Sequence, residues 1–190
     1  SLYAPITEES LKGIAVLLVF LIFRSEFDSV VDGIVYAGIT ALGFAATENT
    51  LYLLSEFLDN GLDGLLRLFF LRVILTGWNH PMYTAFIGIG LAVTRLNKSW
   101  LIKLSAPAVG WLIAVTIHAL HNGILTILRG AAVCIVFPLD WLGWLSILGL
   151  LLWAVHHEKS WLVKQLKDEI AFGTITPEQY RVAISSVART

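Results

Sequence analysis

Long apolar segments separated by short polar breaks make up most of this chain. Each segment approaches or exceeds the roughly 20 residues that an α-helix needs to cross the hydrocarbon core of a bilayer. The pattern therefore predicts five membrane-spanning helices, at residues 6–23, 29–57, 64–94, 101–128 and 131–155. Because Pro81 lacks a backbone donor, we expect a kink or break near the sequence GWNHP in the third helix.

The residues after the fifth segment follow a different pattern. The sequence HHEKSWLVKQLKDEIAF has the spacing of an amphipathic helix, and the Gly-Thr pair after it is expected to end that helix. Thr176 and Pro177 are suited to cap and begin a last short helix. We therefore divide the chain into a transmembrane core, residues 1–155, and a peripheral helical tail, residues 156–190.

Composition places these helices in a lipid bilayer. Hydrophobic residues make up 57% of the 190 residues and charged residues only 14%, and the mean hydropathy is +0.77. Soluble domains contain about 25% charged residues, so the predicted fold is an all-α, polytopic transmembrane helix bundle. The net charge of -1 offers no basic surface for nucleic acid, and the single Cys134 excludes a disulfide framework and a cysteine metal site.

Basic residues predict the orientation of the bundle. Arg95, Lys98 and Lys103 flank the break between the third and fourth segments, and the tail is also rich in lysine, whereas the break at residues 56–63 is acidic. By the positive-inside rule, we expect a multi-pass protein of the cell membrane with its C-terminal tail in the cytoplasm and Ser1 outside. Residues 64–77 contain Arg67 and Arg72, so this segment could instead lie in the membrane interface. No positively charged segment follows Ser1, so we expect no signal peptide, and whether further spans precede this sequence stays open.

Ionisable residues inside membrane spans are costly and mark functional sites. The predicted spans would bury Glu8, Glu9, Lys12, Asp32, Glu48, His80, His118, His121 and Asp140. At 1.5 Å per helical residue, Glu9, Glu48, His80 and His118 would all lie about 21 to 28 Å from the cytoplasmic ends of their helices. Four helices would therefore deliver acid-base or metal-binding side chains to one layer in the outer half of the membrane.

The helical spacing indicates which of these side chains face the interior. Glu48 lies on a stripe at multiples of four with Asp32, Tyr36, Thr40 and Tyr52. Small residues that allow close helix approach flank this stripe: Gly33, Ala37, Ala41 and Ala45. His118 and Asn122 are four residues apart and face the same interior. The spacing of Glu8 and Lys12 predicts an internal ion pair, and we expect structural roles for Lys12, Asp32 and Asp140. A structural role does not account for Glu48, which lies far from either end of an apolar helix.

The sequence contains the motifs EESLK, FAATEN and HALHN, in this order, between Thr7 and Asn122. Together these motifs resemble the pattern of the PrsW family of bacterial intramembrane proteases. The family is distantly related to the CAAX prenyl proteases, and Asn122 stands where many PrsW members carry aspartate and where the CAAX relatives commonly carry asparagine. The resemblance implies cleavage of a single-pass membrane protein, such as an anti-sigma factor, on its extracytoplasmic side.

Two mechanisms suit these residues. In the first, Glu48, His80 and His118 bind zinc with water in the open position, and Glu9 or Glu8 is the general base. In the second, suggested by the CAAX relatives, there is no essential metal: the glutamates and His80 activate water, while His118 and Asn122 polarise the carbonyl. Three potential ligands at one depth favour the metal.

An alternative function is a proton-coupled transporter or channel that uses the same cluster as a proton relay. The sequence shows no internal repeat and no paired, broken helices in two halves, which are typical of many transporters. A purely structural membrane scaffold would leave Glu48 unexplained. The sequence leaves the oligomeric state open.

Overall fold

The computed structural model describes residues 2–184, apart from the side chains at 129, 130, 133 and 158, and this part of the chain is helical without a strand. The elements are α1 (Tyr3–Ile22), η1 (Arg24–Glu26), α2 (Val30–Phe69), η2 (Phe70–Leu75), α3 (Asn79–Leu96), α4 (Trp100–Leu128), η3 (Arg129–Ala132), α5 (Val133–Ala171) and α6 (Pro177–Ile184). They form two compact units, Ser1–Leu148 and Gly149–Thr190. Residues 185–190 of the predicted tail lie outside the described residues.

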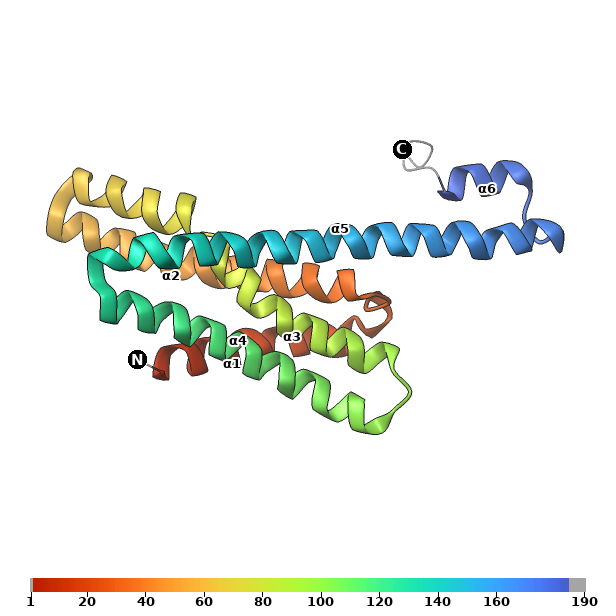
Figure 1. Cartoon of the computed structure of the whole chain (residues 1–190), viewed down its shortest axis with the longest axis horizontal. Helices are drawn as coiled ribbons and strands as arrows, with labels where there is room; N and C mark the ends of the chain where they lie inside the picture. The colour runs from red at the N-terminus through yellow and green to blue at the C-terminus, as the bar shows by residue number, and fades with distance from the viewer. Residues whose placement is uncertain (1, 185–190) are drawn as a thin grey trace. The chain divides into compact units, whose positions relative to one another are not determined.

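In the first unit, consecutive passes of the chain alternate in direction (Figure 1). Three stretches are long and apolar enough to cross a membrane: Val30–Leu96, Trp100–Leu128 and Cys134–Ala171. The first of these includes two of the expected spans, while α1 contains Glu8, Glu9 and Lys12, which lower its apolar character. The architecture confirms the predicted transmembrane helix bundle, and the number of spans is approximate.

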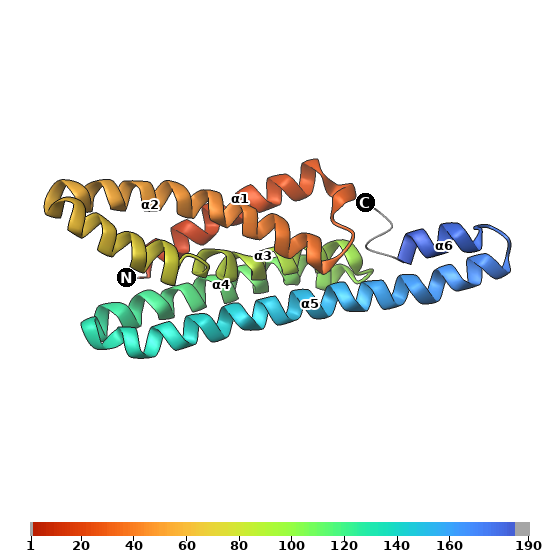
Figure 2. The same ribbon diagram turned by 90° about the horizontal axis from the view of Figure 1, so that it is seen from above.

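Helix α2 reverses direction at Gly61, which has a φ of 66° that glycine adopts readily. The chain then returns beside α2 as a short arm that ends in η2, a π-helix (Figures 1 and 2). A break at residues 76–78 separates this arm from α3. The third expected span, 64–94, is thus two helical pieces, and Pro81 lies in the first turn of α3, where no backbone donor is required.

Helix α3 packs against α2 on one side and α4 on the other (Figure 2). At the α2–α3 crossing, a Cβ atom on either Gly33 or Gly88 would collide with the backbone of the other glycine. Ala37 also lies against Gly88 at this crossing. Ala37, Ala41 and Ala45 are all buried, as expected for small residues that allow close helix approach. The core of the first unit consists of Val16, Phe20, Phe27, Ala37, Met82, Tyr83, Ile87, Leu91 and Ala114.

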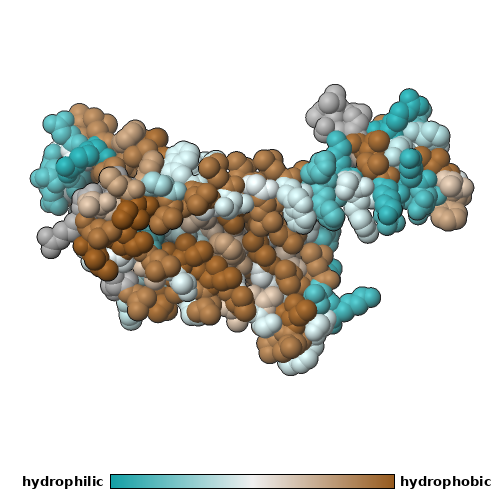
Figure 3. All heavy atoms as spheres, viewed as in Figure 1, coloured by the Kyte–Doolittle hydropathy of each residue, from teal (hydrophilic) through white to brown (hydrophobic). Residues whose placement is uncertain are grey.

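The outer surface of the first unit is largely apolar. Figure 3 shows hydrophobic side chains over much of the visible face of these helices. Large exposed side chains on α1, for example, include Leu11, Ile14 and Leu18. A bilayer is the solvent in which such a surface is stable.

The second unit contains the end of α5 and α6. Thr176 and Gln179 form a reciprocal cap, in which each backbone N–H donates to the other side chain at 2.8 and 3.1 Å. The Tyr180 hydroxyl donates to the Val163 carbonyl at 3.4 Å. The predicted cap and start of the last helix are therefore confirmed, whereas the predicted division between membrane and aqueous parts at residue 155 stays a prediction.

Candidate active site

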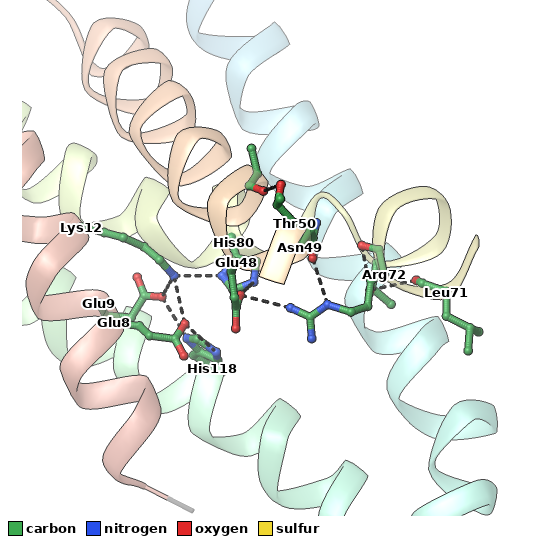
Figure 4. A network of polar contacts seen from close by, with 12 residues as sticks. Glu8, Glu9, Lys12, Glu48, Asn49, Thr50, Leu71, Arg72, His80 and His118 are labelled. Carbon is green, nitrogen blue, oxygen red and sulfur yellow. Dashed lines mark hydrogen bonds and ion pairs between the residues drawn. The ribbon is translucent and has the colours of Figure 1, made fainter. Parts of the chain in front are cut away.

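Carboxylate and imidazole groups from four helices converge in the first unit (Figure 4). Helix α1 provides Glu8 and Glu9, α2 provides Glu48, α3 provides His80, and α4 provides His118. Except for Glu9, these residues line one cavity of about 450 Å³, and Asn122 also lies on its wall. The structure thus brings the sequence-predicted residues together, and their catalytic roles stay predictions.

Glu9 is fully buried and well satisfied by hydrogen bonds. Its Oε1 accepts from Lys12 Nζ at 2.7 Å and lies 2.9 Å from His118 Nδ1. Its Oε2 accepts from the Thr84 hydroxyl at 2.9 Å. These contacts suit Glu9 to hold the Lys12 ammonium and to orient the His118 ring.

Glu8 lies on the cavity side of the same helix. The ion pair between Glu8 and Lys12 that the sequence spacing predicts is confirmed, at 3.6 Å, and Lys12 Nζ also forms a closer ion pair with Glu9, at 2.7 Å. Glu9 is the closer partner because it lies three residues before Lys12 and is buried beside it. Glu8 Oε2 is buried without a hydrogen-bond partner among the described residues, and it lies 3.9 Å from His118 Nε2.

Glu48 is held beside His80 and Arg72. Its Oε2 lies 3.3 Å from His80 Nε2 and 3.1 Å from Arg72 Nη2. The contact with Arg72 is an ion pair, and the contact with His80 is one only when the imidazole is protonated. Neither contact makes a hydrogen bond to Glu48 Oε2. On the other side of its ring, His80 Nδ1 accepts from Lys12 Nζ at 2.9 Å.

Arg72 contacts both Glu48 and Asn49, which are adjacent in α2. Its Nε donates to Asn49 Oδ1 at 2.9 Å, and its guanidinium lies over the Tyr52 ring at 4.1 Å. The sequence offered residues 64–77, which include Arg72, only a placement in the membrane interface as an alternative to a span. The arm after Gly61 returns η2 to α2 and so brings Arg72 to an acidic partner, Glu48.

Three of these side chains could together hold a metal ion, and their carboxylate is Glu8, where the sequence predicts Glu48. Among the described residues, the compact group is Glu8, His80 and His118, whose ligand atoms all lie within 4.8 Å of one another. The sequence-predicted set contains Glu48 instead of Glu8. Helical depth places Glu48 in the layer of the two histidines, but it does not show that Glu48 lies between His80 and Arg72, with Oε2 within 3.3 Å of each.

The donor chemistry of this group fits a metal ion. Glu8 Oε2 has no hydrogen-bond partner among the described residues. His118 directs Nδ1 to the Glu9 carboxylate, which is the contact that orients histidine ligands in metal sites. Both nitrogens of His80 already face other groups, Lys12 and Glu48, so metal binding there would require one of these contacts to yield.

A second polar cluster lies on the wall of the same cavity. His121 Nδ1 lies 3.0 Å from Asp140 Oδ1, and Asn79 Nδ2 donates to Asp140 Oδ2 at 2.8 Å. The sequence analysis noted two of these residues as buried ionisable groups but did not connect them. Asn79 gives no sequence signal, because it lies in the predicted kink.

Comparison with known proteins identifies the family. The sequence profile described as PrsW family intramembrane metalloprotease matches residues 1–154. The chain belongs to the PrsW family.

Curated PrsW relatives agree with this assignment. The chain is similar to Protease PrsW of Oceanobacillus iheyensis, with 31% identity over 110 residues, 57% of this chain and 46% of that protein. It is also similar to Protease PrsW of Bacillus subtilis, with 30% identity over 127 residues, 64% of this chain and 51% of that protein. Protease PrsW of Halalkalibacterium halodurans matches with 27% identity over 156 residues, 79% of this chain and 61% of that protein.

The PrsW match is confined to part of each relative. The chain spans about half the length of the curated relatives named above, between 46% and 61%. No solved structure shows significant similarity to the chain.

Proposed function

We propose that this chain is an intramembrane endopeptidase that hydrolyses a peptide bond of a membrane protein. The observation that carries the proposal is the convergence of Glu8, Glu48, His80 and His118 on one cavity in an otherwise apolar bundle. Membership of the PrsW family supports the same chemistry. A proton relay remains the alternative function and is an outcome of the test below.

Peptide hydrolysis needs a group that takes a proton from water and donors that stabilise the oxyanion. Glu8 and Glu48 both line the cavity. In each, Oε2 is buried and has no hydrogen-bond partner among the described residues. Either carboxylate can act as the base, and His80 lies beside Glu48. Asn122, on the cavity wall, has the amide donor that a developing oxyanion requires.

A bound metal ion, with zinc as our proposal, would be held by Glu8, His80 and His118. It would supply a Lewis acid that polarises a carbonyl or lowers the pKa of bound water. The orientation of His118 by Glu9 supports this arrangement. Removal of the metal with a chelator is expected to abolish cleavage, and added zinc is expected to restore it.

The proposed substrate is a single-pass membrane protein of the anti-sigma-factor type, cleaved near the extracytoplasmic side. The cavity combines its polar residues with apolar ones, among them Leu68, Leu71, Leu75 and Phe137. Such a wall suits the end of an apolar helix that enters from the bilayer. The outer position of the site and the cytoplasmic position of the tail follow from the positive-inside rule and belong to the same proposal.

The test is single-turnover cleavage of a reconstituted membrane substrate by Glu48→Gln. This variant keeps the shape of Glu48 and removes its charge, so we expect cleavage to fall by about 10²- to 10⁴-fold while the protein stays folded. Glu26→Gln, an exposed position in η1, is the matched control and should cleave normally. Full activity of Glu48→Gln would reduce Glu48 to a structural partner of Arg72. Proton flux in liposomes, with no cleavage by the native sequence, would favour the transporter.

A further inference from the structure

His121 and Asp140 form a buried dyad that the proposed mechanism does not use. His121 comes from α4 and Asp140 from α5, and their side chains are 13% and 8% exposed. Both line the cavity that contains Glu8, Glu48 and His118. The dyad therefore borders the space in which a substrate would react.

The contacts of the dyad fix the direction of the imidazole ring. His121 Nδ1 lies 3.0 Å from Asp140 Oδ1. The other carboxylate oxygen, Oδ2, accepts from Asn79 Nδ2 at 2.8 Å. Within the described part of the chain, Nε2 of His121 has no hydrogen-bond partner. A carboxylate on Nδ1 orients a histidine for proton transfer at Nε2 and stabilises its imidazolium form.

The ring of Tyr83 connects this dyad to the first cluster. Its centroid lies 4.8 Å from that of His118 and 6.1 Å from that of His121. Helix α3 contributes adjacent residues to the two clusters, His80 to the first and Asn79 to the second. The two clusters thus share helices α3 and α4, and sites built on helices hold their side chains more precisely than sites on loops.

We propose that His121 is the general acid that protonates the leaving amine, and that Asp140 is the residue that positions it. This inference rests on the proposed peptidase function. Glu8 and Glu48 lie in the cluster suited to activate water, and amide hydrolysis also needs a proton on the departing nitrogen. His121 is the titratable group of the second cluster that can deliver it.

The proton balance of the step closes without another reactant. A glutamate takes one proton from water, and the oxygen of that water bonds to the carbonyl carbon. When the C–N bond breaks, its electron pair goes to nitrogen, which takes the proton from His121 Nε2. The glutamic acid then loses its proton to solvent, and His121 regains one, so each turnover consumes one water.

The test compares two substrates that differ only in the scissile bond. One has the natural amide, and the other has an ester at that position, whose alkoxide leaving group needs protonation less than an amine does. For His121→Gln, we expect amide cleavage to fall about 100-fold or more and ester cleavage to fall less than about tenfold. Asp140→Asn keeps the shape but removes the charge that stabilises the imidazolium, so it should show the same selective loss at a smaller magnitude.

The matched control is His157→Gln, an exposed histidine in the second unit, which should cleave both substrates normally. Equal losses on amide and ester, or no loss on the amide, would overturn the role of His121 and leave the peptidase intact. If the native sequence cleaves neither bond, the proposed function fails and the inference fails with it. If His121→Gln does not fold, the amide-to-ester comparison with Asp140→Asn decides the question.

Discussion

Glu8 and Glu9 are neighbours in sequence with opposite environments. Glu9 is fully buried and contacts Lys12, Thr84 and His118, whereas Glu8 Oε2 has no hydrogen-bond partner among the described residues. A carboxylate whose oxygens are occupied serves to hold its neighbours in place. The oxygen with free lone pairs is the one that can take a proton or bind a metal.

Replacement of Lys12 tests the structural role of Glu9. Lys12→Met leaves the Glu9 carboxylate buried without its cation, which is expected to lower the free energy of unfolding by about 3 to 5 kcal/mol. The measurement is thermal unfolding in detergent. The double variant Lys12→Met/Glu9→Gln removes both charges and should recover a large part of the loss. An unchanged melting temperature for Lys12→Met would show that Glu9 is not ionised in the bundle.

The sequence predicts which residues of this site converge, but not how they pair. Helical depth depends only on residue number, so it correctly brings Glu48, His80 and His118 into one layer. Pairing depends on the rotation of each helix and on residues from other segments. Arg72, which lies 3.1 Å from Glu48, reaches it only because the chain reverses at Gly61.

At the scale of helices, the crossing of α2 and α3 determines the distance between Glu48 and His80. Gly33 and Gly88 are in backbone contact at this crossing, and the two functional side chains lie further along the same helices. Close contact of this kind is typical of small residues between membrane helices. The close approach of the two helices at this crossing therefore allows Glu48 Oε2 and His80 Nε2 to lie 3.3 Å apart.

Gly88→Ala is expected to separate the two helices. Its new methyl group would meet the backbone of Gly33, so we expect a destabilisation of about 1 to 3 kcal/mol and a loss of cleavage larger than the loss of folded protein. Gly43→Ala is the matched control on α2, because a Cβ there has no atom within 4 Å. Its melting temperature should stay the same or rise. Normal stability of Gly88→Ala would mean that the crossing tolerates a wider spacing.

The helical boundaries show a limit of hydrophobic patterning. Apolar residues continue from the arm through η2 to α3, so the pattern at 64–94 indicates one span with a kink or break near Pro81. The structure has a complete break at residues 76–78. The hydrophobic pattern indicates only that these residues lie in an apolar environment. Lipid provides that environment for a returning arm as well as for a straight helix, so the pattern does not distinguish the two.

At the scale of the whole chain, the direction of each pass determines the side of the membrane on which the site lies. In the first unit, Glu8 is near the start of α1 and His80 near the start of α3, and both helices run in the same direction (Figure 1). The site therefore lies toward the end of the bundle that also carries the reversal at Gly61. If the basic loop between α3 and α4 is cytoplasmic, the site belongs to the outer half of the bilayer.

Labelling of single cysteines tests this orientation. In a Cys134→Ser background, Asp59→Cys reports on the reversal near Gly61, and Lys98→Cys reports on the loop between α3 and α4; both positions are exposed. Because the positive-inside rule places basic loops in the cytoplasm, a membrane-impermeant maleimide should label Asp59→Cys in intact cells. It should label Lys98→Cys only after the membrane is permeabilised. The Cys134→Ser parent gives the background signal. The reverse pattern would place the site in the cytoplasmic half, and a substrate cleaved there would have to present its scissile bond from the cytoplasm.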